Sequence, residues 1–336
     1  MSMRRKTLLL GYVGHGNFGD DMMVEAVEGF LPPDDVEIVS AREPMPSLIR
    51  RLAGARQIVV CGGGVIGKRH GSYQRVLAVA KLLGVRRSFF SIEIDGWPAG
   101  RTGAIQRWIM QGADLSVRTA ASRAIALREV GDQSVPVVLD AFYLHPAFES
   151  LGPALSDKDL GRFRVAAARQ DDMGETGHDI IVLPRSFGDR GDYTEAMNVE
   201  RVVDEVLRVT SPGSPSRIAI SPSAAVDDVR CYIDGLEAAG YDVETIDGDV
   251  PLVISPRTHV ITNRLHIAKL CSFFAIPNSL VSYAIKTERP EIVGETGSVV
   301  QLAGNRLQGR EIAMSSAEYE FRRQEAAEIL TKLLDR

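Results

Sequence analysis

The stretch TLLLGYVGHGNFGD, residues 7–20, decides the fold, because an apolar run ends there at a cluster of glycines and an acidic residue. The apolar run, residues 7–12, is far shorter than the ~18 residues of a membrane span. Asn17 and Asp20 follow too soon for it to be the core of a signal peptide. A helical pattern over residues 20–30 comes next. A buried strand, a glycine-rich turn and a helix in this order predict the start of a parallel α/β sheet.

Short apolar runs and helical patterns continue to alternate through the first half of the chain. This alternation predicts a parallel sheet that helices cover on both faces, which is a doubly wound α/β unit. The predicted strands after the first are 36–40, 57–61, 88–94, 113–118 and 135–139, and the predicted helices are 47–53, 72–83, 103–112 and 120–130.

The alternation breaks over residues 150–178, which are rich in polar side chains, and then resumes. We therefore predict an N-terminal α/β domain over 1–160, a linker over 161–178, a C-terminal α/β domain over 179–310 and a closing amphipathic helix within 311–336. Two such domains predict a ligand cleft between them. The predicted strands of the second domain are 179–183, 217–221, 241–246, 251–255 and 279–283, and its predicted helices are 197–209, 226–240 and 263–274.

The composition is that of an ordinary globular protein, and it argues against several classes of function. The 336 residues are 45% hydrophobic, which is ample to form packed cores. Acidic residues outnumber basic ones, 44 to 39, for a net charge of −5, which argues against a nucleic-acid-binding protein. The cysteines Cys61, Cys231 and Cys271 are far apart, and neither they nor the histidines and carboxylates have metal-ligand spacing. We expect reduced core cysteines, a cytoplasmic location and no bound metal.

Two glycine-rich segments follow predicted strands, where free backbone amides can approach a ligand closely. In the first, Gly14, Gly16 and Gly19 fit the pattern G-x-G-x-x-G, but no Gly-Lys-Ser/Thr follows, so the segment is not a P-loop. The second, Gly62-Gly63-Gly64, could form a backbone nest for an anion. The alternatives are a tight turn with Asp20 as a helix cap in the first segment, and close packing of the next helix in the second.

Several cationic side chains follow predicted strands. Arg264 and His266 are two residues apart, so they cannot share a helix face and can converge only where a strand turns into a helix. Arg118, Arg185 and Lys286 each follow another apolar run. Since the carboxyl ends of parallel strands meet at one edge of a sheet, these residues predict an anion-binding site. The imidazole beside Arg264 is suited to a proton transfer there.

In this order, the segments resemble the polysaccharide pyruvyl transferase family over about residues 8–290. The chain departs from the family pattern at Thr119, where Asp is common, and over 68–70, where basic residues replace an Asp. The matching segments are Gly11 to Asp20, Gly62-Gly63-Gly64, Ser116-Val117-Arg118, Asp140, Arg264-Leu265-His266, Ile276-Pro277, Tyr283 and Lys286.

The resemblance implies two Rossmann-like doubly wound domains in a glycosyltransferase-B-like arrangement, and a transfer of pyruvate from phosphoenolpyruvate to two hydroxyls of one sugar. The acceptor would belong to a cell-surface polysaccharide or its oligosaccharide precursor, and phosphate would be released. An acceptor linked to lipid would bring the enzyme to the inner face of the plasma membrane. Phosphoenolpyruvate would be a co-substrate, with no cofactor, no metal and no nucleic-acid partner.

The resemblance also implies a role for each candidate residue. His266 would be the general acid, and Arg118, Arg264 and Lys286 would bind phosphoenolpyruvate, with Arg185 as a further contact. The residues expected to line the acceptor or phosphate pocket are Gly14, His15, Gly16, Asn17, Asp20, Gly62, Gly63 and Gly64.

Two other functions fit the same residues. One is a glycosyltransferase of the same architecture with a nucleotide-sugar donor, in which Glu288 would hold the ribose. The other is a non-catalytic relative that binds a glycan or an anion, which the departures at Thr119 and 68–70 favour.

Overall fold

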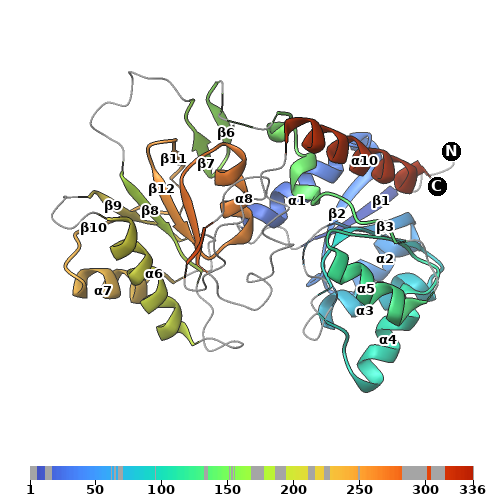
Figure 1. The fold of residues 1–336 in the computed structure, drawn as a ribbon. Helices are drawn as coiled ribbons and strands as arrows, with labels where there is room; N and C mark the ends of the chain where they lie inside the picture. Colours follow the sequence, from blue (N-terminus) through green and yellow to red (C-terminus); the bar gives the residue numbers. More distant parts are fainter. Residues whose placement is uncertain are drawn as a thin grey trace. The chain divides into compact units, whose positions relative to one another are not determined.

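The chain forms two compact units in the computed structural model (Figure 1). Unit 1 comprises residues 1–14, 19–149 and 320–336, and unit 2 comprises residues 15–18 and 150–319. The structure describes residues 6–11, 17–61, 63, 66, 71–94, 96–131, 135–150, 152, 154, 156–167, 178–185, 194–210, 216–222, 228–248, 250–281, 301–303 and 315–335.

Unit 1 is built on a five-stranded parallel sheet with the order β2-β1-β3-β4-β5. Residues on both faces of β1 are buried, as expected for a strand that helices cover on both sides. The direction in which successive strands are added changes between β1 and β3, and this place is the switch point of the sheet. Ligands of such sheets bind there, beyond the carboxyl ends of the strands. The strands are β1 (Lys6–Gly11), β2 (Val36–Ser40), β3 (Ala55–Cys61), β4 (Arg86–Ile92) and β5 (Asp114–Val117).

The helices of unit 1 surround this sheet and share its apolar core. Strand residues such as Leu10 and Val60 belong to one buried cluster with Leu48, Leu77 and Ile109 of the helices. The helices are α1 (Phe18–Glu28), α2 (Met45–Ala53), α3 (Gly71–Leu82), α4 (Gly100–Met110) and α5 (Ala120–Val130), with 3-10 turns η1 (Pro33–Asp35), η2 (Ala141–Leu144) and η3 (Pro146–Phe148).

The predicted closing segment contains the helix α10 (Ser316–Asp335), which buries Ala326, Leu330 and Leu333, and most of the helix belongs to unit 1. The carbonyl of Leu334 accepts hydrogen bonds from Arg56 Nη2 at 2.8 Å and from Gln57 Nε2 at 3.3 Å. Arg323 Nε donates to the carbonyl of Tyr143 at 3.1 Å. The last helix of the chain thus completes the unit that the first strand begins.

Unit 2 is built on a six-stranded parallel sheet with the order β10-β9-β8-β12-β13-β14. Counted along the chain from β8, this is the order 3-2-1-4-5-6 of dinucleotide-binding folds, with the switch point between β8 and β12. The strands are β8 (Ile180–Leu183), β9 (Ile218–Ile220), β10 (Val243–Thr245), β12 (His259–Thr262), β13 (Asn278–Val281) and β14 (Gln301–Ala303).

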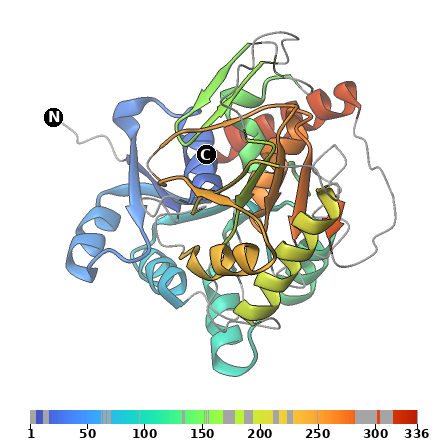
Figure 2. The same cartoon turned by 90° about the vertical axis from the view of Figure 1, so that its left-hand side faces the viewer.

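Within the described residues of unit 2, helices α6 (Glu195–Val209), α7 (Arg230–Ala238) and α8 (Leu265–Phe273) flank the sheet. Helices α6 and α7 lie side by side in Figure 2, and their Val202, Val206 and Leu236 pack with strand residues. Helix α8 contacts β12 and β13. The fold class of two doubly wound α/β units is therefore confirmed.

The structure corrects three sequence predictions. Residues in the predicted linker 161–178 form part of a small sheet of β6 (Lys158–Leu160), β7 (Phe163–Val165) and β11 (Leu252–Ile254). The predicted strand 251–255 therefore pairs with β7, outside the main sheet. The predicted strand 135–139 makes only a bridge between Val117 and Val137.

The strand β12 was not predicted at all, because its four residues lie close behind the more apolar run of β11. Among the described residues, no helix combines the length and apolar character needed to cross a membrane.

Candidate functional site

The first candidate site lies at the switch point of unit 2, beyond the carboxyl ends of β8 and β12. The two strands are parallel neighbours, with Leu183 in register with Thr262. Pro184 and Arg185 continue from β8, and Asn263 and Arg264 continue from β12. Two predicted cations from distant parts of the sequence therefore follow adjacent strand ends.

Side-chain hydrogen bonds fix the turn after β12. Thr262 Oγ1 donates to the carbonyl of Leu183 at 2.7 Å and accepts from the backbone N–H of Arg264 at 3.0 Å. Asn263 Oδ1 accepts from the backbone N–H of Arg185 at 2.6 Å. The hydroxyl of Tyr232 donates to the carbonyl of Arg185 at 3.0 Å. Hydrogen bonds to both the N–H and the carbonyl of Arg185 thus fix its backbone at this end of the sheet.

Arg264 and His266 occupy the start of α8. Arg264 is the N-cap residue and is only 9% exposed, and His266 is the second helical residue and half-buried. Nη1 of Arg264 lies 3.4 Å from Oδ1 of Asn17, which belongs to unit 2. Four predicted site residues, Asn17, Arg185, Arg264 and His266, are therefore found at one end of the sheet of unit 2.

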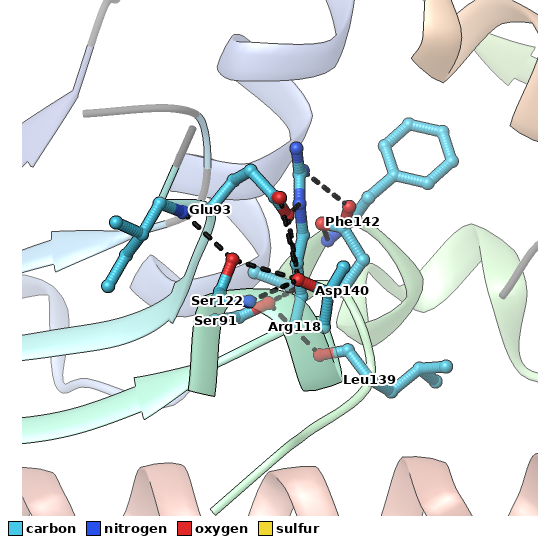
Figure 3. A network of polar contacts seen from close by, with 10 residues as sticks. Ser91, Glu93, Arg118, Ser122, Leu139, Asp140 and Phe142 are labelled. Atoms are coloured by element: carbon cyan, nitrogen blue, oxygen red, sulfur yellow. Dashed lines mark hydrogen bonds and ion pairs between the residues drawn. The ribbon is translucent and has the colours of Figure 1, made fainter. Parts of the chain in front are cut away.

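The second candidate site is a buried ion network in unit 1 (Figure 3). Arg118, directly after β5, donates from Nε to Glu93 Oε2 at 3.1 Å and from Nη1 to Asp140 Oδ2 at 2.8 Å. The side chain of Arg118 is 5% exposed and both carboxylates are fully buried. One guanidinium thus bridges two carboxylates, a geometry that Lys cannot reproduce. These contacts give Arg118 a structural role. Its role in binding the donor stays a prediction.

A bulge in β4 directs Glu93 toward Arg118. The register of β4 against β5 shifts between Phe89 and Ile92, and Ser91 has a φ of 53°, which is unusual for a residue with a side chain. Its hydroxyl donates to the carbonyl of Leu139 at 3.1 Å and accepts from the backbone N–H of Ala141 at 3.0 Å. The strained serine therefore ties β4 to the segment that carries Asp140.

The network also reaches the glycine triplet. The backbone N–H of Glu93 donates to the carbonyl of Gly63 at 2.9 Å, and Ile66 forms a bridge with Ile94. Gly63 has a φ of 70°, a conformation that favours glycine. Gly63 is therefore held by Glu93, the residue that also binds Arg118.

Thr119, where the family pattern has Asp, caps α5. Its hydroxyl accepts from the backbone N–H of Ser122 at 3.1 Å and lies 3.4 Å from both oxygens of the Glu93 carboxylate. A threonine can therefore supply the helix cap that an aspartate would supply, without adding a third buried carboxylate.

Other predicted site residues are placed differently or lie outside the described residues. Asp20 is in the first turn of α1, which begins at Phe18, so it is not the cap. In the described part of the chain, no three His, Cys, Asp or Glu side chains group as a metal site would require. The predicted residues outside the described residues are Gly14, His15, Gly16, Gly62, Gly64 and Lys286, together with Glu288 of the alternative function.

Sequence reasoning missed Glu93 and Asn263. Glu93 lies inside the predicted strand 88–94. Its contact with Arg118 depends on a bulge that no local sequence pattern predicts. Asn263 stands directly before Arg264, and its position after an apolar strand was the signal that could have found it.

No protein-family model and no curated protein matches the chain. A structure named for a UDP-N-acetylglucosamine 2-epimerase from Listeria monocytogenes is similar with a TM-score of 0.49 at 10% identity, covering 98% of this chain and 90% of that chain. The apo structure of OtsA gives 0.44 at 12% identity, covering 98% and 96%. An alpha-glucosyltransferase in complex with UDP gives 0.38 at 8% identity, covering 97% and 95%. Matches at this level carry no argument about the reaction, which has to be argued from the residues.

Proposed function

We propose that the protein is a pyruvyl transferase that moves pyruvate from phosphoenolpyruvate onto two hydroxyls of a sugar in a cell-surface glycan or its precursor. The observation that carries the proposal is the pair of arginines at the switch point of unit 2, with His266 at the start of the next helix. The ordered motifs that resemble the pyruvyl transferase family support the same reaction.

The donor has two anionic groups, a phosphate and a carboxylate. Arg185 and Arg264 follow neighbouring strands, so two arginines start from one end of the sheet. Arginine suits both groups because its planar fork can donate two parallel hydrogen bonds. Lys286 and Arg118 keep the donor-binding role that the resemblance implies, and the glycine-rich segments keep the acceptor or phosphate role.

The reaction needs an acid, because the enol phosphate becomes electrophilic at its central carbon only when its methylene carbon is protonated. We assign this proton to His266. The neighbouring carbon then takes the first sugar hydroxyl, which loses its proton. The second hydroxyl adds to the same carbon and loses its proton as the bond to phosphate breaks, so one hydroxyl proton restores the acid and the other leaves with phosphate. Phosphoenolpyruvate and a diol thus give a cyclic ketal and inorganic phosphate, without oxidation or reduction.

A nucleotide-sugar glycosyltransferase is the second candidate. The strand order of unit 2 is the one found in dinucleotide-binding sheets, and Arg264 at the start of α8 could then hold a diphosphate.

Thermal unfolding with added ligands separates the two functions. We expect phosphoenolpyruvate at 100 times its Kd to stabilise the protein by about 2.7 kcal/mol, with smaller effects of UDP- and GDP-sugars. The Arg264→Ala variant should lose this stabilisation, whereas Arg230→Ala, which removes an exposed arginine from α7, should keep it.

Stabilisation by a nucleotide sugar alone would favour the glycosyltransferase. Phosphoenolpyruvate binding that is lost in Arg264→Ala, followed by phosphate release with a glycan acceptor, would support the pyruvyl transferase. If His266→Ala released phosphate at the wild-type rate, the assignment of the acid would be wrong.

A further inference from the structure

We infer that Asn263 is a further binding residue of this site, whose side-chain amide nitrogen donates a hydrogen bond to a phosphate oxygen of the ligand at the start of α8. The inference deepens the proposed function and rests on it only for the identity of the ligand. The site itself would be an oxyanion site, which a phosphoryl group of any ligand could occupy.

The orientation of the Asn263 amide follows from its neighbour. The backbone N–H of Arg185 can only donate, so the atom that lies 2.6 Å from it must be the oxygen of Asn263. The NH2 group is then directed elsewhere with two hydrogens to donate. Asn263 is completely buried, and its Nδ2 has no hydrogen-bond partner in the described part of the chain.

An unmade hydrogen bond of this kind needs an explanation, because buried polar groups are nearly always paired. The carbonyl side of the same amide is used, and Thr262 on one side and Arg264 on the other are both held by hydrogen bonds. Hydrogen bonds therefore fix this turn, while Nδ2 of Asn263 still has hydrogens to donate. A ligand oxygen would satisfy that donor, and in a site closed to water the bond would be strong.

The start of α8 supplies the second, independent observation. The helix is nine residues long, and its N-cap residue Arg264 makes no side-chain hydrogen bond to the first turn. The first N–H groups of a helix lack partners within the helix, and the helix dipole adds a partial positive charge there. Asn263 directly precedes this N-cap residue, and Arg264 itself adds a guanidinium to the same turn. A neutral donor, backbone amides and a cation together suit a phosphate.

At this position an asparagine and an aspartate would act differently on an anionic ligand. A carboxylate in the same place would still accept from Arg185, but its second oxygen would repel an anionic ligand. Asn263→Asp is therefore close to isosteric, removes the donor and adds a negative charge, which the nearby arginines Arg185 and Arg264 would help the folded chain to hold.

The test is the affinity of the full chain for phosphoenolpyruvate, inorganic phosphate and UDP, measured by calorimetry. We expect Asn263→Asp to weaken the binding of whichever of these probes the wild type binds by at least about tenfold. The matched control is Asn278→Asp, in a second buried asparagine whose Nδ2 already donates to Ser272 Oγ and the carbonyl of Ile276. The control should leave the affinity unchanged.

Unchanged affinity in Asn263→Asp would overturn the inference, as would a wild type that binds none of the three probes. Weaker UDP binding in the variant, with no phosphoenolpyruvate binding in the wild type, would support the inference and contradict the proposed function. If the variant does not fold, an NMR titration of the wild-type protein still tests the inference. The side-chain 15N–1H2 signals of Asn263 should shift when the bound probe is added, and signals that do not move would overturn the inference.

Discussion

Replacing Arg118 with methionine tests whether the ion network of unit 1 stabilises the fold. The change removes the cation from between Glu93 and Asp140, which are both fully buried. Removing one partner of a buried ion pair typically costs about 3–5 kcal/mol, because a buried charge is left without compensation. Asp140 keeps a hydrogen bond from the backbone N–H of Phe142 at 3.2 Å, so we expect the lower half of that range.

The assay is calorimetric unfolding of the full chain. A loss of about 3–4 kcal/mol corresponds to a fall in Tm of roughly 6–16 °C for a unit of this size. Arg75→Met on α3 removes an exposed arginine and should leave the Tm within about 2 °C of the wild type. Hydrogen exchange gives a local readout, since the N–H of Glu93 that bonds Gly63 should exchange faster in the variant.

A further variant separates lost charge compensation from lost packing. Changing Arg118→Met together with Glu93→Gln and Asp140→Asn removes the three charges of the two described ion pairs, so at least half of the lost stability should return. If Arg118→Met melts like Arg75→Met, or if the triple variant is no more stable than the single one, the reasoning from buried charge is refuted.

Three other predictions concern packing, pH and thiol chemistry. A Cβ on Gly235 would lie 2.7 Å from Val199 Cγ1, so Gly235→Ala should lower the free energy of unfolding by about 1–2 kcal/mol; in a Val199→Ala background, urea titration should show no loss. Burial lowers the pKa of His259 from 6.5, so the unfolded chain binds more protons just below pH 6.5 and stability falls as the pH is lowered through that window. His259→Gln should show a smaller fall between pH 7 and pH 5, and equal falls would contradict the shift. Burial raises the pKa of Cys61 to about 12 and that of Cys231 to about 11, so iodoacetamide at about pH 8 should label neither in the native protein, as mass spectrometry would show.

Strands and helices with strong local signals could be predicted from the sequence. The predicted strand 36–40 and the predicted helix 120–130 have the bounds that the structure gives them. The bounds of the helix are marked by the N-cap Thr119 and by Gly131, which follows it with a φ of 98°. The strand β12 could not be predicted in this way, because its four residues form a strand by pairing with β8 and β13, which are other segments of the chain.

The candidate site could be predicted only in part, because its residues meet through the order of the strands. The sequence placed Arg185 and Arg264 after apolar runs, and their adjacency follows from the pairing of β8 with β12. The partners of Arg118 lie 25 and 22 residues away and depend on the bulge at Ser91. Local patterns predict which residues end a strand, whereas only the assembled sheet determines which strand ends are neighbours.

Helix α10 has a consequence for the order of events during synthesis. Unit 1 needs residues 320–336, but the ribosome makes them only after residues 150–319 of unit 2. At 5–20 residues per second, unit 1 would wait about 10–30 s between its residue 149 and its last helix. During that time the guanidinium of Arg56 and the side-chain amide of Gln57 lack the Leu334 carbonyl to which they donate in the finished protein. Unit 2 can therefore complete its sheet first, so the first-made unit would be the last to finish folding.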